Sequence, residues 1–443
     1  MSDTPLYTAL INHKKCNRAS FHTPGHKCAA GALPQDLLKL DFTELPDTDS
    51  LFEADGAILQ AEQKASALFG TKRTLISSGG CTLCIQAMLR LAAPNGGKII
   101  AGRVIHRSAV NSMALLDLQP IWVLPRQNAG VSLAGRICAE DIADALRKNP
   151  DAKAVYLTSP DYFGVLSDIS AISNVCRQYG VPLLVDNAHG AHLMFTTQNL
   201  HPITLGASMT ACSAHKTLPV LTGGAWLNIA DTRFADNAKD AMALFGSTSP
   251  SYPIMASLDL SRAWLSEHGA QAYRKLEGTV AEIKHLAANC GIQLPQGIVD
   301  PTRITLNTAS IGMTGTSAAE LFRKRGVEPE YADASHVVLI ATPFNTEADF
   351  DCLSAAIQAL PTAPSLPDHP ALPPLPTMNV SPRQAIFGGW EQVELHKAKG
   401  RIAAQAACPC PPGVPVVMPG EILTKEVIDF LLGYGFFAIK VLK

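Results

Sequence analysis

Charged residues are scarce in this sequence, and it has neither a positively charged run nor a long apolar stretch. Asp, Glu, Lys and Arg supply only 17% of the 443 residues, and 36 basic against 38 acidic side chains leave a net charge of −2. Without a basic surplus, we expect no nucleic-acid partner. No apolar run could span a bilayer, and the N-terminus lacks the features of a signal peptide. The sequence therefore predicts a cytoplasmic protein that is not bound to a membrane.

A cysteine framework is also missing. The eleven cysteines are an odd number and lie mostly in apolar segments, as Cys176, Cys212 and Cys352 do, which is typical of buried, reduced thiols. Cys81-Thr-Leu-Cys84 has the spacing of a redox motif or zinc half-site, but no second such pair follows. Cys408-Pro-Cys410 is too tight for a usual metal knuckle. We interpret both pairs as structural.

The remaining composition describes a large globular protein. Hydrophobic residues make up 47% of the chain, whose length suits two or three domains around a sizeable core. A surface with so few charges is typical of proteins that are partly covered by subunit contacts, which favours a homo-oligomer.

Short apolar runs alternate with amphipathic stretches. A helix is predicted over 58–69, ending at Gly70, and apolar runs then follow. The main runs are 98–101, 154–157, 181–185 and 224–229. This alternation predicts an α/β fold with a mostly parallel sheet covered on both faces. Ligands of such sheets collect beyond the carboxyl ends of the strands.

Composition divides the chain into four parts. Residues 1–50 are rich in turn-forming residues and are expected to form an N-terminal arm, and residues 51–295 should form the large domain. Residues 296–376 should form a smaller α/β segment that ends in the proline-rich linker 361–376. Residues 377–443 have their own pattern and are expected to form a C-terminal domain.

Lys216 lies in an unusual setting for a lysine. It belongs to Ser213-Ala-His-Lys216, which follows the small-residue run 207–212 and precedes Gly223-Gly224. Burial among small and apolar neighbours would lower the pKa of its amine, which favours the neutral, nucleophilic form. Taken alone, the pattern also fits a structural lysine.

Asp186 directly follows the apolar run 181–185, so its carboxylate should lie at the end of a buried strand. Because an unpaired charge there is costly, a cationic partner is expected. That partner could be the protonated ring nitrogen of a cofactor or an ordinary salt bridge. The carboxylate could instead cap a helix together with Asn187.

A glycine-rich turn, Ser77-Ser-Gly-Gly-Cys-Thr82, precedes the amphipathic stretch 83–91. The backbone amides at the start of this helix belong to Gly80, Cys81 and Thr82. A helix start favours an anion such as a phosphate group. Ser213 and His215 could add donors to the same anion, although a plain tight turn would give the same pattern.

Three histidines need separate interpretation. His106 follows the apolar run 99–105 and could stack on a flat ligand ring, or could be an ordinary core histidine. His189 and His192 lie in Asp186-Asn-Ala-His-Gly-Ala-His192, where with Asp186 they also resemble a metal-ligand cluster. A metal would leave the lysine and the glycine turn without a role, so we expect none.

These residue types are the ones that pyridoxal 5'-phosphate needs. It requires a lysine amine for a Schiff base, a carboxylate at the pyridine nitrogen, an anion cradle and a flat group against the ring. Lys216, Asp186, the glycine turn and His106 supply one candidate for each requirement. The sequence therefore predicts a pyridoxal-phosphate enzyme.

Several motifs in order resemble the pyridoxal-phosphate-dependent ornithine, lysine and arginine decarboxylases. They span nearly the whole chain: Phe21-His-Thr-Pro-Gly-His-Lys27, Asp47-Thr-Asp-Ser-Leu51, Asp186-Asn-Ala-His-Gly-Ala-His192, Ser213-Ala-His-Lys216, Ser247-Thr-Ser-Pro-Ser-Tyr252, Cys408-Pro-Cys-Pro-Pro-Gly413 and Pro419-Gly-Glu421. The C-terminal part also resembles the family's own C-terminal domain, which favours decarboxylation over other reactions of this cofactor.

The resemblance implies an aspartate-aminotransferase-like fold and decarboxylation of a basic amino acid for polyamine metabolism. It further implies a homodimer or larger assembly with sites at subunit boundaries, where Ser247 and Thr248 would reach the phosphate of the neighbouring subunit. The family's long N-terminal wing domain has no counterpart here, so the chain resembles the shorter branch. Lys216 or His189 would return a proton to the α-carbon of the substrate.

Three positions depart from the family pattern, namely Cys81, Ala214 and Cys410. Cys81 can still offer its backbone amide, whereas the change at Cys410 leaves the choice of substrate open. The cationic side chain of the substrate needs an acidic partner. The candidates are Glu421, Asp49 and Glu53. An aminotransferase or aldolase of the same fold, or a catalytically silent paralogue that acts as a binding or regulatory partner, are the alternatives.

Overall fold

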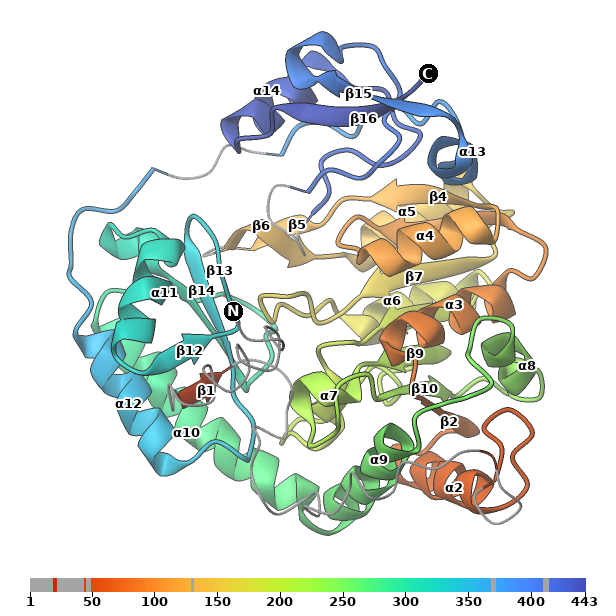
Figure 1. Cartoon of the computed structure of the whole chain (residues 1–443), viewed down its shortest axis with the longest axis horizontal. Helices are drawn as coiled ribbons and strands as arrows, with labels where there is room; N and C mark the ends of the chain where they lie inside the picture. Colours follow the sequence, from red (N-terminus) through yellow and green to blue (C-terminus); the bar gives the residue numbers. More distant parts are fainter. Residues whose placement is uncertain (1–18, 22–43, 45–48, 129–130, 368–371, 409–413) are drawn as a thin grey trace, which may run out of the picture.

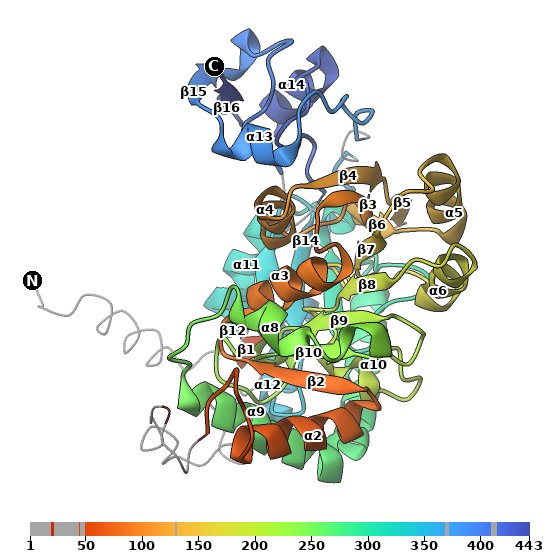
Figure 2. The same cartoon turned by 90° about the vertical axis from the view of Figure 1, so that its right-hand side faces the viewer.

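A seven-stranded sheet forms the centre of the computed structural model, which describes residues 19–21, 44, 49–128, 131–367, 372–408 and 414–443 (Figures 1 and 2). In spatial order its strands are β2 (Arg73–Ser77), β10 (Ala225–Ile229), β9 (Met209–Cys212), β8 (Leu183–Asp186), β7 (Ala154–Thr158), β3 (Gly97–Gly102) and β4 (Leu118–Val123). Strand β10 is antiparallel to β2 and β9, and the other pairs are parallel. The predicted α/β class and mostly parallel sheet are confirmed.

Helices cover both faces of this sheet. The helices of this part are α2 (Ala57–Phe69), α3 (Gly80–Ala92), α4 (Arg107–Leu115), α5 (Ala139–Lys148), α6 (Ile169–Gln178), α7 (Ala214–Thr217) and α8 (Ala238–Ala243), with the hairpin β5 (Arg126–Asn128) and β6 (Val131–Arg136). Because strand side chains alternate, Ile99 and Ala154 join the core under α3 and α4, whereas Ile100 and Val155 join the core under α5 and α6. The predicted helix 58–69 is α2, and Gly70 ends it in a left-handed conformation.

A long helical connection leads from the large sheet to a smaller unit. It consists of α9 (Tyr252–Trp264), a π-helical turn η4 (Leu265–Gly269) and α10 (Ala270–Asn289). The smaller unit contains the antiparallel strands β11 (Arg303–Asn307), β14 (His336–Ile340) and β13 (Tyr331–Ala332), the helices α11 (Gly315–Lys324) and α12 (Glu347–Gln358), and β12 (Val327–Pro329) paired with β1 (Ala19–Phe21). Helix α10 precedes the predicted domain boundary at 295–296 and α12 follows it, yet both contribute to one core. The boundary stays a prediction.

The C-terminal part has a core of its own, built around Val417, Leu423, Val427 and Val441. Its elements are α13 (Pro382–Phe387), β15 (Trp390–Glu394), α14 (Lys425–Gly433) and β16 (Ala438–Leu442). The described residues of the proline-rich linker form no helix or strand. Most of the predicted arm, and Cys410, lie outside the described residues.

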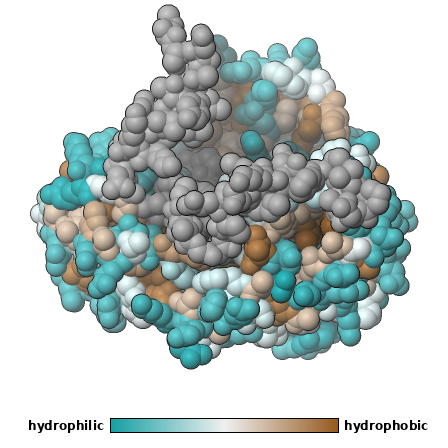
Figure 3. Space-filling view, turned by 60° about the horizontal axis from the view of Figure 1, so that its bottom comes forward, coloured by the Kyte–Doolittle hydropathy of each residue, from teal (hydrophilic) through white to brown (hydrophobic). Residues whose placement is uncertain are grey.

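Two properties of the described chain can be compared with its composition, namely the distribution of apolar residues on the surface and the length of the apolar helices. On the face shown in Figure 3, apolar residues form small separate patches within a mostly hydrophilic surface. Among the residues that the structure describes, no helix is both long and apolar enough to cross a membrane.

A fully buried ion pair joins the C-terminal part to the large sheet. Arg103 follows β3, and its Nη1 and Nη2 donate to the two carboxylate oxygens of Glu421 at 2.6 and 2.7 Å. The Arg103 Nε also donates to the Pro415 carbonyl at 2.9 Å, and the Met418 amide donates to Glu421 at 2.7 Å. The guanidinium and the carboxylate thus depend on each other for neutralisation.

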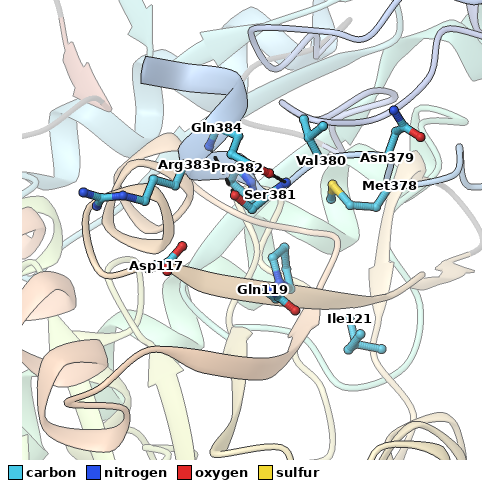
Figure 4. Close-up of a pocket in the computed structure, with 11 residues that line it drawn as sticks. Asp117, Gln119, Ile121, Met378, Asn379, Val380, Ser381, Pro382, Arg383 and Gln384 are labelled. Carbon is cyan, nitrogen blue, oxygen red and sulfur yellow. Dashed lines mark hydrogen bonds between the residues drawn. The ribbon is translucent and has the colours of Figure 1, made fainter. Parts of the chain in front are cut away.

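A surface cleft of about 600 Å³ lies along the same seam (Figure 4). One wall is the edge strand β4 with Gln119 and Ile121, and the other is the segment 378–384 that leads into α13. Arg383 points away from the cleft and donates to the carbonyls of Ala114 and Leu115 at the end of α4. The cleft therefore belongs to the contact between the C-terminal part and the sheet edge.

Arg103→Ala should lower the free energy of unfolding by about 3–5 kcal/mol, because it leaves the buried Glu421 carboxylate without its cation. Urea unfolding followed by tryptophan fluorescence would measure this. Lys425→Ala is the matched control, since it breaks the exposed Lys425–Asp429 pair and should change stability little. Equal effects of the two substitutions would contradict a structural role for the buried pair.

Candidate active site

The residues singled out in the sequence meet at the carboxyl ends of the central strands. Asp186 is the last residue of β8, and Lys216 lies in α7, directly after β9. The glycine turn connects β2 to α3, and His106 lies between β3 and α4. Parallel strands bring these segments to one edge of the sheet, as expected for an α/β ligand site.

The amine of Lys216 contacts an imidazole. Its Nζ lies 2.9 Å from the Nε2 of His189, and the lysine side chain is half-buried. Burial lowers the pKa of the Lys216 amine, while the negative charges of Asp186 and Glu330 act in the opposite direction. Burial, together with the charges of Lys216 and Arg303, holds the pKa of His189 well below its usual value, so the ring is neutral.

Arg303, at the start of β11, lies against the imidazole of His189. The Arg303 Nη2 lies 3.5 Å from the His189 Nδ1 and 3.4 Å from its carbonyl oxygen. A guanidinium can only donate, so a hydrogen bond from Arg303 to the Nδ1 requires the proton of the neutral ring to be on Nε2. In that tautomer the Nε2–H faces the Lys216 Nζ, and a neutral amine there would accept it.

Asp186 is a buried carboxylate whose hydrogen-bond donors among the described residues are neutral. It accepts hydrogen bonds from the Ala188 amide at 3.1 Å and the Tyr156 hydroxyl at 3.2 Å. Burial raises the pKa of the Cys81 thiol, which thus keeps its proton and lies 4.0 Å from the same carboxylate. Among the described residues, no Lys, Arg or His nitrogen forms an ion pair with Asp186.

This environment fits a protonated pyridine nitrogen. Burial raises the pKa of Asp186, although the charges of His106 and Lys216 oppose that effect. A cationic ring nitrogen beside the carboxylate would supply the partner that the described residues do not place there. The geometry of Asp186 therefore agrees with the interpretation of this residue as a cofactor ligand.

The glycine turn starts α3 without a side-chain cap. Gly80 has a φ of 71°, and its amide donates to the Gly223 carbonyl at 2.8 Å. The following amides of Cys81 and Thr82 begin the helix, and Thr82 is exposed. A helix start of this kind can hold a phosphate, and Gly80 is required because few other residues adopt its conformation.

Two further candidate phosphate ligands contact each other. The Ser213 Oγ lies 3.2 Å from the His215 Nδ1, which also lies 3.3 Å from the Gly224 carbonyl oxygen. The loop 221–224 thus connects His215 to the glycine turn through Gly223. This arrangement holds both side chains in place before any ligand binds.

His106 is accessible and caps α4, where its Nδ1 accepts the Ser108 amide at 3.2 Å. The charges of Asp186 and Lys216 act on its ring from nearby. His106 follows β3, at the same end of the sheet as Asp186 and Lys216. Its predicted stacking role stays a prediction.

His192 does not join the cluster considered as a metal site. Its Nε2 lies 3.1 Å from Asp300 and 2.8 Å from the Thr302 hydroxyl, and all three residues are buried. Within the described part of the chain, no group of three His, Cys, Asp or Glu side chains could hold a metal ion. His192 is a structural residue that holds the segment before β11.

Ser247 and Thr248 lie in the exposed loop between α8 and α9. The Ser247 Oγ accepts the Ser249 amide at 3.2 Å. Their proposed contact with a neighbouring subunit stays a prediction.

Two of the three candidate acidic partners for the cationic side chain of the substrate, Glu421 and Asp49, have other roles in the structure. Glu421 is neutralised by Arg103. Asp49 caps α2 by accepting the amides of Gly56 and Ile58, each at 2.9 Å. Burial alone would raise the pKa of Asp49, but these backbone hydrogen bonds hold it below its usual value. Glu53 remains exposed and accepts the Ser50 hydroxyl.

Sequence reasoning missed Tyr156, Tyr162, Arg303 and Glu330. Tyr156 could have been found, because it points from β7 to the same face as Asp186 on the next strand. Tyr162 follows the end of β7, and its ring lies perpendicular to His189 with the centroids 4.9 Å apart. Arg303 and Glu330 come from the smaller unit, and nothing in their local sequence indicated the contact.

This sheet, with a lysine beyond β9 and a buried carboxylate at the end of β8, has the fold of the fold-type-I class of pyridoxal-phosphate enzymes. The lysine decarboxylase of Francisella novicida superposes with a TM-score of 0.81 at 20% identity, over 99% of this chain and 81% of that one. At this identity the likeness establishes the fold alone.

Sequence comparison identifies the family. The Orn/Lys/Arg decarboxylase major domain matches residues 4–292, and the C-terminal domain of the same family matches residues 370–438. An arginine decarboxylase of Bacillus subtilis is 31% identical, over 97% of this chain and 93% of its own length. The constitutive lysine decarboxylase of Escherichia coli is 24% identical, over 97% and 77%.

The chain therefore belongs to the Orn/Lys/Arg decarboxylase family, whose members are pyridoxal-phosphate-dependent decarboxylases of basic amino acids. The predicted family, fold class and reaction are confirmed. An aminotransferase and an aldolase are no longer needed as alternatives to explain the sequence.

Arg303→Leu should shift the capture of pyridoxal phosphate by the cofactor-free protein to higher pH. The positive charge of Arg303 lowers the pKa of both Lys216 and His189, so its removal raises both values and leaves less neutral amine at pH 7. The rate at which visible absorption appears, measured from pH 6 to 10, would test this.

Lys284→Met is the matched control. It removes a positive charge that contacts the carbonyls of Asp300 and Pro301 instead of His189, and its profile should stay close to that of the native chain. A profile unchanged in Arg303→Leu would show that Arg303 does not act on the amine.

Proposed function

We propose that this chain is an arginine decarboxylase that binds pyridoxal phosphate covalently through Lys216 and forms agmatine and carbon dioxide. The contact of 2.9 Å between the Lys216 Nζ and the His189 Nε2, beside the buried Asp186, carries the proposal. Arginine is favoured over lysine because the B. subtilis relative named arginine decarboxylase is 31% identical, against 24% for the E. coli lysine decarboxylase.

Each part of the cofactor has a proposed ligand. Asp186 pairs with the ring nitrogen, and His106 covers one face of the ring. The phosphate is bound at the glycine turn, where Gly80 gives the turn its shape and Cys81 and Thr82 offer backbone amides. Ser213 and His215, from the segment that precedes Lys216, add side-chain donors. Ser247 and Thr248 complete the phosphate site of a neighbouring subunit.

When bound, pyridoxal phosphate supplies an electron-withdrawing ring that stabilises the negative charge left as carbon dioxide departs. The protein residues prepare the site for this. His189 donates its Nε2–H to Lys216 and keeps the amine neutral, and Asp186 favours a protonated nitrogen at its carboxylate. After carbon dioxide has left, Lys216 or His189 returns a proton to the α-carbon of the substrate.

We also propose that the enzyme is a cytoplasmic homodimer or larger homo-oligomer that serves polyamine metabolism. The exposed positions of Ser247 and Thr248 and the low charge content support an assembly with sites at the subunit boundary. Sedimentation of the purified protein would measure its oligomeric state.

Purified protein with pyridoxal phosphate should convert arginine to agmatine with a higher kcat/KM than it has for lysine or ornithine. Chromatography of the amine products from all three amino acids would measure this. Lys216→Ala should lose both the visible absorption of the bound cofactor and all turnover, because no other amine replaces it. After borohydride reduction, mass spectrometry should find the cofactor mass on Lys216.

The results separate two levels of the proposal. A preference for lysine or ornithine would refute arginine as the substrate and leave the decarboxylase assignment intact. Turnover by Lys216→Ala, or reductive trapping at another lysine, would refute the assigned site.

Asp186→Asn should retain some bound cofactor and lower kcat by at least about 10²-fold, because the neutral amide no longer favours a protonated ring nitrogen. Asp168→Asn, which only changes the cap of α6, should leave kcat unaltered. Comparable rates for both variants would exclude Asp186 from the reaction.

A further inference from the structure

Tyr156 lies next to the Asp186 carboxylate in the central sheet. It is the middle residue of β7, and its side chain lies on the same face as that of Asp186, because Tyr156 pairs with Leu184 and Thr158 pairs with Asp186. The Tyr156 hydroxyl donates to the Asp186 Oδ2 at 3.2 Å. Tyr156 is 0% exposed and Asp186 is 2% exposed, so bulk water does not reach this hydrogen bond.

The ionisable groups around Asp186 come from several elements of the large sheet. The Cys81 thiol, on α3, lies 4.0 Å from the Asp186 Oδ1. Burial and the negative charge of Asp186 raise the pKa of the Tyr156 phenol and of the Cys81 thiol, so both groups keep their protons and can donate them. The other ionisable groups that interact electrostatically with Asp186 are Cys84, Cys212, His106 and Lys216.

The Tyr156 hydroxyl and the Ala188 amide stabilise Asp186 as a carboxylate, because a hydrogen bond from a neutral donor favours the charged form of its acceptor. Burial acts in the opposite direction and raises the pKa of Asp186. A basic ring nitrogen beside Asp186 would share one proton with it. Moving this proton from the carboxyl oxygen to the nitrogen breaks an O–H bond and forms an N–H bond, with no change in the number of protons or electrons. The phenol favours the products of this transfer.

We infer that Tyr156 is a positioning residue, whose hydroxyl keeps Asp186 ionised and so places the shared proton on the ring nitrogen of bound pyridoxal phosphate. This inference rests on the proposed function, since it assumes that the ring nitrogen lies at Asp186. Tyr156 belongs to the core under α3 and acts through Asp186. The protonated nitrogen is the feature that makes the ring a strong electron acceptor.

The first test uses the cofactor-free protein. Tyr156→Phe removes the hydroxyl and keeps the aromatic ring. Asp186 should then be protonated to a larger extent at neutral pH, because its carboxylate loses a donor that water does not replace. An infrared difference spectrum against the native protein should show the stretching band of a carboxylic acid. The same band should be missing from the double variant that also carries Asp186→Asn.

The second test uses pyridoxal phosphate that is isotopically labelled at the ring nitrogen. Solid-state nuclear magnetic resonance distinguishes a protonated ring nitrogen from a neutral one. Tyr156→Phe should shift the equilibrium about tenfold from the nitrogen towards the carboxyl oxygen, because a hydrogen bond to a charged group is lost. Its kcat should fall less than that of Asp186→Asn, since the carboxyl group remains.

Tyr273→Phe is the matched control. Tyr273 is also 0% exposed, but its hydroxyl donates to the neutral carbonyl of Thr217 at 2.7 Å. This variant should keep the native infrared spectrum and the native nitrogen signal. An unchanged nitrogen signal in Tyr156→Phe would overturn the inference. The same change in both variants would overturn it as well, since altered packing would then explain the result.

The two measurements separate this inference from the proposed function. If Tyr156→Phe shifts both proton equilibria while the native protein forms no agmatine, the inference stands and the assigned reaction is wrong. If the native protein forms agmatine and its nitrogen signal does not depend on Tyr156, the reaction stands and the inference is wrong. If Tyr156→Phe changes only the infrared spectrum of the cofactor-free protein, Asp186 is not the partner of the ring nitrogen, and the inference fails together with that part of the site.

Discussion

The enclosed negative charge of Asp186 is the constraint on which the rest of the site depends. Burial raises the pKa of Asp186 and lowers the pKa of Lys216, so it favours the neutral form of both groups. The positive charge of Lys216 and the negative charge of Asp186 act in the opposite direction, because each stabilises the charged form of the other. Arg303 and the neutral His189 shift this balance at the lysine. A cationic ring nitrogen would neutralise Asp186 directly, so that Lys216 no longer has to provide the positive charge and can react as an amine.

Two units of the fold contribute to this balance. The large sheet supplies Lys216, Asp186 and His189 from the ends of adjacent strands, and the smaller unit supplies Arg303 and Glu330. The first group provides the chemistry of the cofactor. The second group contacts His189 through Arg303 and places a carboxylate against the Tyr162 hydroxyl. The reactive amine thus lies between residues that are fixed by different parts of the chain.

The parts of this site that sequence predicted are those carried by local pattern. Asp186 was found because it ends an apolar run, and the glycine turn because it precedes an amphipathic helix. Arg303 and Glu330 were not found, because their roles arise from contacts across 114 and 168 residues with His189 and Tyr162. Glu421 was one of three unranked candidates for the acidic partner of the substrate, and only the folded structure reveals its pairing with Arg103.

The distance in sequence between Arg103 and Glu421 has a consequence for biosynthesis. Glu421 is translated 318 residues after its partner, which takes roughly 15–60 s on a ribosome that adds about 5–20 residues per second. During that interval the end of β3 lacks its neutralising carboxylate. The ion pair that joins the C-terminal part to the large sheet can therefore form only when the last part of the chain has left the ribosome.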